Sequence, residues 1–170
     1  MSAPVTERLA LRELGPQDAG AFAAFFASPH SAFYGGPVSA DESWRRLAMY
    51  AGHRALRGWG PWAVTLRETG ETVGMAGPYY PEGWPAPEIT YLLVPGHTGQ
   101  GYATEAVRAC IDWAWRAGWD EVVSAVEAAN APSVRLAQRL GGVADGEALV
   151  PPDRRLTIYR YPRPAAESAA

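Results

Sequence analysis

Several short stretches of the chain alternate apolar and polar residues, and a period of two predicts β-strands. In the first of them, Leu9 and Leu11 alternate with charged residues. The same reasoning predicts strands at residues 6–14, 62–67, 72–79, 87–94, 121–127, 143–150 and 155–161. The strand at 121–127 shows little alternation, which is typical of a strand that is buried on both faces.

Between these strands, apolar residues recur every three or four positions, which predicts helices at 16–28, 39–55, 103–118 and 130–140. Ser39 and Glu42 have the spacing of a capping box, in which two side chains satisfy free N–H groups at a helix start. Asn130 is expected to cap the last helix. In the second helix we expect one apolar stripe facing the core, made of Trp44, Leu47, Ala48, Ala51 and Ala55.

The resulting order of elements is β-α-α-β-β-β-α-β-α-β-β, with antiparallel strands at both ends and one βαβ unit in the centre. It predicts an α/β fold on a mixed, mostly antiparallel sheet of about seven strands with flanking helices. The chain shows no repeat and no internal linker, so residues 1–162 are expected to form one domain. Residues 163–170 are expected to be a disordered tail.

The composition indicates a soluble protein and narrows its partners. The 170 residues are 48% hydrophobic and 19% charged, with a net charge of −3 and no basic stripe, which argues against nucleic acid as a partner. No apolar run approaches the roughly 20 residues that span a bilayer, so no membrane partner is expected. The start of the chain lacks a signal-peptide pattern, and its single cysteine cannot form an internal disulfide. We therefore expect a cytoplasmic protein.

The histidines and the cysteine give no sign of a metal site, and no metal is expected. His30, His53 and His97 show no metal-ligand spacing with one another or with acidic residues. His97 lies beside the turn described next, where it could approach a phosphate, although packing of the turn explains it as well. Cys110 lies on the apolar side of the helix at 103–118, where we expect it in the core.

A glycine-rich turn joins the strand at 87–94 to the helix at 103–118, in the stretch V-P-G-H-T-G-Q-G-Y-A-T-E-A. A helix start offers free N–H groups and a partial positive charge, so it attracts anions. Glycines at 99 and 101 would let a phosphate approach the main chain itself. The glycines alone leave an alternative open, a plain strand-to-helix turn that needs them only for their left-handed backbone.

Two widespread phosphate-binding turns do not fit this stretch. A P-loop requires Lys and then Ser or Thr after its last glycine, and here Tyr102 follows Gly101. A dinucleotide-binding turn requires a third glycine where Thr104 stands, and its fold is built from two parallel halves. Only one βαβ unit can be read here, which disfavours a nucleotide-dependent oxidoreductase.

A third phosphate-binding motif fits better. T-G-Q-G-Y-A-T-E-A, after a strand that ends Y-L-L-V-P, resembles the pyrophosphate-binding signature of the GNAT family of N-acetyltransferases, an Arg or Gln followed by x-x-G-x-G/A. The opening T-E-R-L-A-L-R-E-L, the strand E-I-T-Y-L-L-V-P, Asn130-x-x-Ser133 and Arg139-Leu140-Gly141 resemble further parts of that family. Together they most resemble the subgroup related to ribosomal-protein N-terminal (RimJ/RimL-like) acetyltransferases.

Three positions depart from the family's pattern. Thr98 stands where the signature has Arg or Gln, which removes one side-chain contact to phosphate. Gly142 replaces an aromatic residue, and Ala137 stands where other members carry a tyrosine that serves as general acid. The changes at 98 and 137 favour an alternative function for the same fold, a non-catalytic module that binds or senses acyl-CoA.

The resemblance implies acetyl-CoA as co-substrate and the GNAT acyl-CoA N-acyltransferase fold. In that fold the two strands of the βαβ unit splay apart, and the pantetheine arm fills the gap. Main-chain groups of Leu92, Leu93 and Val94 would bind this arm and the thioester oxygen, and Asn130 would pair with the arm or hold a water. Phosphate contacts would come from Thr98, Gly99, Gln100, Gly101, Tyr102, Ala103 and Thr104.

The implied reaction is direct attack of a primary amine on the thioester in a ternary complex. It needs a base, because only a neutral amine attacks and amine pKa values lie at about 8 to 10.4. Glu88 begins an apolar strand on the face of Thr90 and Leu92, where desolvation would raise its pKa. A solvated glutamate is the equal alternative on the residues alone, and the family pattern favours the base. Ser133 would help to protonate the leaving thiolate, or would only bond the helix start at Asn130.

The acceptor is the part of the reaction that the sequence defines least. By resemblance, Phe33, Tyr34, Tyr80 and Trp84 would contact it, because the family shapes its amine site in the corresponding loops. A small molecule and a protein N-terminus both fit as acceptors. A homodimer is compatible with the sequence as well.

Overall fold

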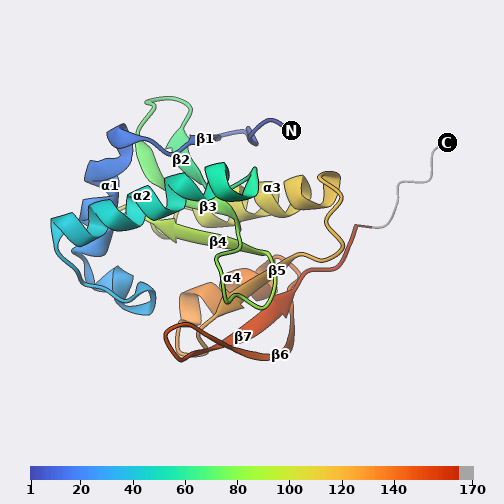
Figure 1. Ribbon diagram of the computed structural model, residues 1–170. Coiled ribbons are helices and arrows are strands. Elements are labelled where there is room, and N and C mark those ends of the chain that lie inside the picture. The colour runs from blue at the N-terminus through green and yellow to red at the C-terminus, as the bar shows by residue number, and fades with distance from the viewer. Residues whose placement is uncertain (165–170) are drawn as a thin grey trace.

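The computed structural model describes residues 1–164, so most of the predicted tail at 163–170 lies outside the described residues. The strands are β1 (Leu9–Glu13), β2 (Trp62–Leu66), β3 (Thr72–Tyr79), β4 (Glu88–Leu93), β5 (Val123–Val126), β6 (Val143–Val150) and β7 (Arg154–Arg160). They form one sheet in the order β1-β2-β3-β4-β5-β7-β6 (Figure 1). β4 and β5 are parallel and the other neighbours are antiparallel, which confirms the predicted mixed sheet.

Helices cover both faces of the sheet. They are α1 (Ala19–Phe26), α2 (Ala40–Arg57), α3 (Tyr102–Arg116) and α4 (Ala131–Arg139), with short 3₁₀ helices η1 (Pro16–Asp18) and η2 (Pro29–Tyr34) on either side of α1. α1 and α2 pack on one face, in a cluster that includes Met75 of β3 and Leu92 of β4. α3 packs on the other face, in a cluster that includes Trp62 of β2 and Ile89 of β4. β4 is therefore held from both sides.

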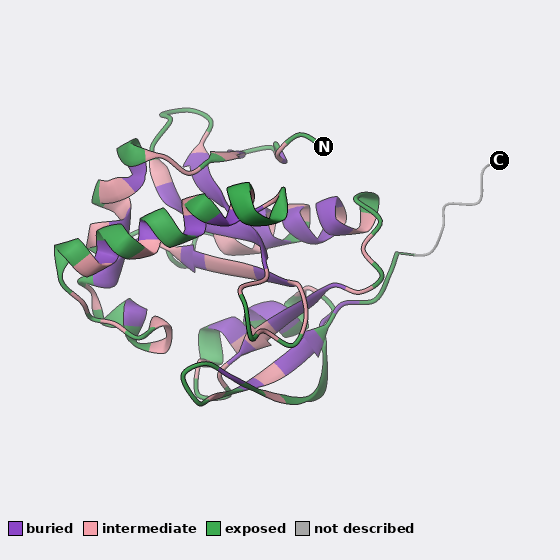
Figure 2. Ribbon diagram, viewed as in Figure 1, coloured by how far each residue is buried: buried purple, intermediate pink, exposed green. Residues whose placement is uncertain are grey.

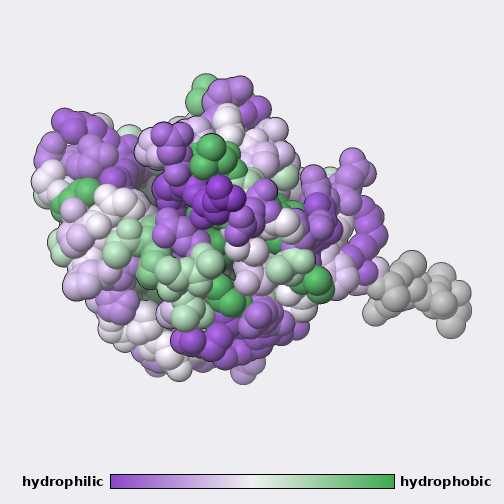
Figure 3. All heavy atoms as spheres, turned by 90° about the horizontal axis from the view of Figure 1, so that it is seen from below, coloured by the Kyte–Doolittle hydropathy of each residue, from purple (hydrophilic) through white to green (hydrophobic). Residues whose placement is uncertain are grey.

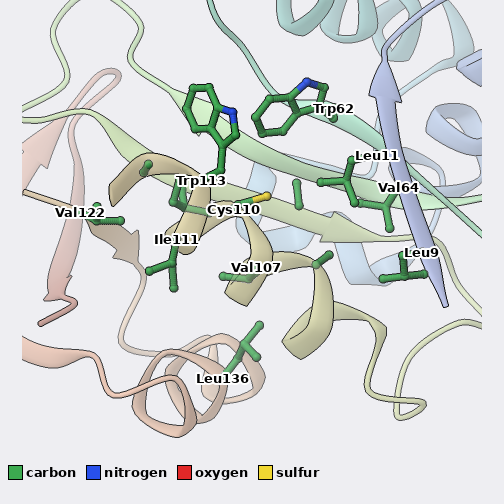
Figure 4. Packing of buried hydrophobic residues seen from close by; sticks show 14 of the residues in the cluster. Leu9, Leu11, Trp62, Val64, Val107, Cys110, Ile111, Trp113, Val122 and Leu136 are labelled. Atoms are coloured by element: carbon green, nitrogen blue, oxygen red, sulfur yellow. The ribbon is translucent and has the colours of Figure 1, made fainter. Parts of the chain in front are cut away.

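α3 is fixed in the core by its apolar side. Val107, Cys110 and Ala114 have no exposed surface, which confirms the expectation for the cysteine. Trp113 stands edge-on against Trp62 of β2, with ring centroids 5.0 Å apart and planes at 80° (Figure 4). Since the body of α3 is locked in this way, its N-terminus and the glycine turn before it have a fixed position relative to β4.

The apolar stripe predicted for α2 is wrong except at Leu47, which is buried in the core. Trp44 is 62% exposed, and Figure 2 shows the outward face of this helix as exposed. His53 faces inward because both ring nitrogens find partners, Nδ1 at 3.0 Å from the carbonyl oxygen of Trp59 and Nε2 at 2.9 Å from the amide nitrogen of Tyr80. The buried residues of α2 are Ser43, Leu47, Tyr50 and His53.

The capping box predicted for α2 does not form, although Ser39 is the N-cap residue. The Ser39 hydroxyl donates to the carboxylate of Asp41, and no side-chain cap bond is made to the main chain. Glu42 pairs with Arg45 and Arg46 one turn further along the helix. Ion pairing within the helix therefore takes the carboxylate that the box would need.

Burial falls from the centre of the sheet toward β6 (Figure 2). In β5, Val123, Ser124 and Val126 are buried, as predicted for a strand covered on both faces. At the β6 edge, Val143 is 68% exposed and Leu149 is 65% exposed. Among the helices formed by residues 1–164, none combines the length and the apolar character needed to cross a membrane.

Gly74 of β3 sets the close approach of β3 to β4, and Gly74→Ala should destabilise the protein. A Cβ at this position would stand 2.3 Å from the carbonyl oxygen of Leu92 and 2.8 Å from a methyl carbon of Leu93. We expect a loss of about 1–3 kcal/mol in the free energy of unfolding, measured in urea.

Gly52→Ala is the matched control, because Gly52 lies inside α2 and an added Cβ would meet nothing within 4 Å. This change should stabilise the protein by roughly 0.5–1 kcal/mol, since alanine favours a helix interior. A Gly74→Ala protein as stable as the wild type would show that the approach of the strands is not a constraint.

Candidate active site

β4 and β5 part immediately after they meet. They pair at one position, Glu88 with Val123, which are the first residues of the two strands. Further along, a side chain bridges them, because the Ser124 hydroxyl donates to the carbonyl oxygen of Ile89 at 2.7 Å. The predicted splay is present, and it leaves main-chain groups of β4 without a neighbouring strand.

The groups at this open edge belong to alternate residues of β4, because main-chain groups along a strand point to opposite neighbours in turn. The carbonyl oxygens of Ile89 and Tyr91 receive side-chain hydroxyls on the open side, from Ser124 and Tyr34. The N–H of Val94 donates to Val73 on the β3 side at 2.9 Å. Tyr91 and Leu93 therefore present their main-chain groups to the gap.

Glu88 stands where the two strands separate. Its side chain is buried, with 5% of the residue exposed, and its Oε2 accepts the N–H of Ala125 in β5 at 2.7 Å. The carboxylate thus bonds a main-chain group that β4 itself no longer reaches. Burial raises the pKa of Glu88 to about 7, although the bond from Ala125 acts in the opposite direction.

A cavity of about 400 Å³, here called the Glu88 cavity, lies beside this carboxylate. Its walls come from η2, α2, β3, the β3–β4 loop and β7. It also contains the charged residues Glu42, Arg46, Glu127 and Arg154. Its aromatic lining includes Phe26, Phe33, Tyr34, Tyr50, Tyr79 and Trp84.

A second cavity of about 580 Å³, here called the glycine-turn cavity, lies between β4, the glycine turn and α4. Its lining includes Leu92, Leu93, Thr98, Gly99, Gly101, Ala103, Thr104, Arg135 and Arg139. The two cavities meet, because Phe33, Tyr34, Tyr91, Asn130 and Ser133 line both of them. The two cavities therefore adjoin along these five residues.

The glycine turn has the backbone that its composition predicts. Gly96, Gly99 and Gly101 have φ of +92°, +77° and +83°, in the left-handed region where other residues are strained. Gly101 is the N-cap residue of α3. An added Cβ on Gly99 would meet nothing within 4 Å, so open space lies outside the turn. The glycines therefore supply the left-handed backbone that a plain strand-to-helix turn would need. They also leave room for an anion at the start of α3.

Comparison with known proteins identifies the family. The family described as acetyltransferase (GNAT) domain matches residues 8–143. The chain belongs to the GNAT family of acetyltransferases. YkkB of Bacillus subtilis is 31% identical over 143 residues, which cover 81% of this chain and 83% of that protein.

Solved structures agree with this family. An acetyltransferase from Agrobacterium tumefaciens is 36% identical with a TM-score of 0.85, over 95% of both chains. Aminoglycoside acetyltransferase AAC(6')-Ib in complex with coenzyme A has a TM-score of 0.75 at 18% identity, over 91% of this chain and 95% of that chain, which shows the likeness of fold alone. The protein is an acetyl-CoA-dependent N-acetyltransferase with the GNAT fold.

The GNAT cofactor residues expected from the sequence fall into two groups. Leu92, Leu93, Thr98, Gly99, Gly101, Ala103, Thr104 and Asn130 line the glycine-turn cavity. The side chains of Gln100 and Tyr102 point elsewhere, because Gln100 donates to the carbonyl of Gly96 at 3.0 Å and the Tyr102 ring lies under the guanidinium of Arg8. The expectation that Val94 offers main-chain contacts to the cofactor is corrected, because its N–H already donates to Val73 of β3.

The expectation for Leu92 is also corrected in part. Its main-chain groups turn toward β3 like those of Val94, so only its side chain reaches the glycine-turn cavity. Tyr91, which sequence reasoning missed, takes its place at the open edge. The signal that could have found it is the alternation of main-chain direction, once Val94 had been assigned to the β3 side.

Of the four residues expected to contact the acceptor, three line the Glu88 cavity. Phe33, Tyr34 and Trp84 lie in its wall, whereas Tyr80 does not. The Tyr80 ring is covered by the guanidinium of Arg57 at 4.8 Å. Tyr80 follows β3 directly, and its main chain is held by His53, so its side chain turns away from the cavity.

Arg8 is a site residue that the sequence did not reveal. It donates to the carbonyl oxygen of Gln100 in the glycine turn at 3.0 Å and pairs with Glu105 of α3 at 2.7 Å. Glu105, in the first turn of α3, is therefore tied to the chain just before β1. Arg8 lies 92 residues before Gln100, and no local pattern signals such a contact.

Two arginines of α4 lie in the same cavity as Thr98. Arg135 and Arg139 lie one helical turn apart, are exposed, and line the glycine-turn cavity together with Thr98. Neither forms an ion pair with any of residues 1–164, although Arg139 comes within 3.5 Å of the Thr104 hydroxyl. The cavity therefore combines open main-chain N–H groups with two uncompensated positive charges, as a diphosphate would need.

Asn130 and Ser133 organise the start of α4. The Asn130 Oδ1 accepts the N–H of Ser133 at 3.3 Å, which confirms Asn130 as the cap. Ser133 is 9% exposed and lies at the junction of the two cavities. The main chain of Ser133 thus bonds the helix start at Asn130, which is the alternative role expected for this residue. Ser133 also lines both cavities.

The histidine beside the glycine turn has a partner within the protein. His97 Nε2 lies 3.3 Å from a carboxylate oxygen of Glu71. His97 therefore connects the glycine turn to the loop before β3. Nowhere among residues 1–164 do three His, Cys, Asp or Glu side chains gather as a metal site requires.

The raised pKa of Glu88 should make stability depend on pH. The folded protein holds a proton up to a pKa of about 7 that the unfolded chain releases at its ordinary value of 4.5. The stability from this proton is complete below the lower value and is lost as the pH rises through the higher one. From about pH 5 to about pH 8, the wild type should lose roughly 2 kcal/mol relative to Glu88→Gln, measured by urea unfolding.

Glu68→Gln is the control, because Glu68 is exposed between β2 and β3. Its stability should follow that of the wild type at every pH. Parallel curves for the wild type and Glu88→Gln would show that the Glu88 carboxyl is not buried as described.

Proposed function

We propose that the protein acetylates a primary amine by direct attack in a ternary complex, with Glu88 as the base. The observation that carries this proposal is the position of Glu88, which lies buried in the wall of the cavity that meets the glycine-turn cavity. A carboxyl with a pKa of about 7 is available as a base near neutral pH. An amine with a pKa of about 8 or more can pass its proton to this group, directly or through one water.

The glycine-turn cavity is proposed to hold acetyl-CoA, which supplies the acetyl thioester that the amine attacks. The N–H groups of residues 99–104 and the guanidinium groups of Arg135 and Arg139 would bind its phosphates. The N–H of Tyr91 and the main-chain groups of Leu93 at the open edge of β4 would bind the rest of the molecule, because the Tyr91 carbonyl already accepts the Tyr34 hydroxyl. A main-chain N–H that faces the thioester oxygen would stabilise the charge that develops there, by roughly 3 kcal/mol per donor.

Ser133 is proposed to help return a proton to the departing thiolate. It lies at the junction of both cavities, close in sequence to Ala137, which takes the position of the family's tyrosine. The demand on this residue is small, because a thiol with a pKa of about 8.5 yields a fair leaving group without help. The loss of the tyrosine is therefore compatible with catalysis.

The alternative of a non-catalytic acyl-CoA-binding module explains less of this arrangement. A sensor would use the glycine-turn cavity but would have no need for a buried carboxyl in the adjoining cavity. Burying a carboxyl that forms no ion pair costs stability, so its presence favours a chemical role in addition to its hydrogen bond with Ala125. Membership of the subgroup related to ribosomal-protein N-terminal acetyltransferases is part of the proposal and is supported by the sequence motifs quoted above.

Glu88→Gln should lower kcat about 100-fold at saturating acetyl-CoA, because the amide keeps the shape but accepts no proton. The Kd of acetyl-CoA, measured by calorimetry, should stay within a factor of about two, since Glu88 lines only the other cavity. In the wild type, kcat should rise with pH through an apparent pKa of about 7, and the variant should lose this limb. Unchanged turnover in Glu88→Gln would remove this residue from the mechanism.

Arg135→Gln and Arg139→Gln should each weaken acetyl-CoA binding about tenfold through the loss of a charge-assisted hydrogen bond to phosphate. The wild type should gain roughly 2.7 kcal/mol of stability at a ligand concentration of about 100 Kd, and the shift in Tm should shrink in both variants. Arg45→Gln is the control, because Arg45 is exposed on α2 and lines neither cavity. Full affinity in both α4 variants would place the phosphates elsewhere.

A further inference from the structure

The wall of the Glu88 cavity is formed mainly by aromatic rings that support one another. Tyr50 of α2 and Tyr79 of β3 have ring centroids 5.1 Å apart, and Trp84 of the β3–β4 loop stands edge-on to Tyr79 at 5.9 Å. Because each ring is held by its neighbour, the wall is a firm apolar surface. Such a surface fits a flat, apolar body.

Glu88 is the one acidic residue of this cavity that forms no ion pair among residues 1–164, although the charge of Arg154 acts to lower its pKa. Glu42 pairs with Arg46 at 3.4 Å, and Glu127 pairs with Arg154 at 2.6 Å. If one ammonium group of an acceptor lies at Glu88, any second one would lie in a cavity that already contains the guanidinium groups of Arg46 and Arg154. The charge pattern therefore matches an acceptor with a single amine.

The two arginines are also occupied by the protein itself. Arg46 donates to the carbonyl oxygens of Tyr34 and Gly35, and Arg154 donates to the carbonyl oxygen of Phe33 at 2.7 Å. Together they fasten η2, which supplies part of the aromatic wall, to α2 and β7. Both guanidinium groups also pair with carboxylates of the protein, Glu42 and Glu127, so an acceptor carboxylate would have to compete with these groups, which disfavours amino acids.

Loops from two sides border the cavity. Pro81 and Trp84 of the β3–β4 loop and Pro151 of the β6–β7 turn line it. The loop and the turn are in contact, because a Cβ on Gly83 would lie 3.0 Å from the Pro151 ring. Both reach the lower side of the molecule in Figure 1, and on that face hydrophobic residues lie between hydrophilic ones (Figure 3). A volume of about 400 Å³ between such loops suits a small molecule.

We propose that the acceptor is a small monoamine with an apolar, ring-bearing body and no carboxylate, whose amine meets Glu88 while its body packs on the wall of Tyr50, Tyr79 and Trp84. This proposal rests on the proposed function, since it assigns the substrate class of the same site. It assigns a small-molecule acceptor, in place of a polycation, an amino acid or a protein N-terminus, to a protein whose sequence motifs resemble those of N-terminal acetyltransferases.

The test is an acceptor panel on the wild-type protein at saturating acetyl-CoA. The probes are 2-phenylethylamine, ethylamine, phenylalanine, spermidine and a short peptide with a free N-terminal alanine. We expect kcat/KM for 2-phenylethylamine to exceed that for each of the other four at least about tenfold, because only this probe offers one amine, a ring and no carboxylate. A higher value for spermidine, phenylalanine or the peptide would overturn the proposal.

A variant pair tests the wall itself. Trp84→Ala should lower the ratio of kcat/KM for 2-phenylethylamine to that for ethylamine about tenfold, because the ring of the acceptor loses its partner. The ratio cancels any effect of the change on Glu88, since both amines use the same base. Trp44→Ala is the matched control, because Trp44 is 62% exposed on α2 and lines neither cavity, and it should leave the ratio unchanged.

The outcomes distinguish this proposal from the proposed function. Turnover of some amine, with the ratio unchanged in Trp84→Ala and in the milder Trp84→Phe, would overturn the acceptor class and leave the acetyltransferase mechanism in place. Binding of acetyl-CoA without turnover of any probe would overturn both the mechanism and the acceptor class.

Discussion

The structure of the site depends on one hydrogen bond, from the N–H of Ala125 to the carboxylate of Glu88. A parallel pair of strands that separates after one residue leaves polar main-chain groups inside the protein, and such groups are costly when they stay unpaired. Here side chains fill the role of the missing strand partner: Ser124 and Tyr34 bond to carbonyl groups of β4, and Glu88 bonds to β5. The opening for the cofactor and the position of the base therefore come from the same local solution.

This solution sets stability against function. A buried carboxyl with a pKa of about 7 costs free energy in its charged form, and that same cost makes it a useful base at neutral pH. The core on both sides of β4 compensates for it, with α3 and Trp113 against one face and the aromatic cluster of α1 and α2 against the other. The strand that carries Glu88 is thus packed against helices on both faces.

The sequence predicted most of the fold, because strands and helices follow local periodicity, and it predicted the glycine turn and Glu88, because each stands out against an apolar pattern. The prediction failed where long-range partners decide. α2 turns its Trp44 outward because His53 finds partners in Trp59 and Tyr80. Arg8, Arg46 and Arg154 could not be assigned to the site, since their partners lie on other elements. The main-chain direction at Val94 follows from the register with β3, which a single strand does not reveal.

In the proposed function, the residues shared by the two cavities would bring the two substrates together at one point. Phe33 and Tyr34 belong to η2, Tyr91 to β4, and Asn130 and Ser133 to the start of α4. η2 is bound to α2 by Arg46 and to β7 by Arg154, and it is bound to the open edge of β4 by the Tyr34 hydroxyl. The wall for the acceptor and the edge for the cofactor are therefore parts of one hydrogen-bonded unit. A shift of η2 would move both together, so under the proposed function the fold itself would set the distance between the two reacting groups.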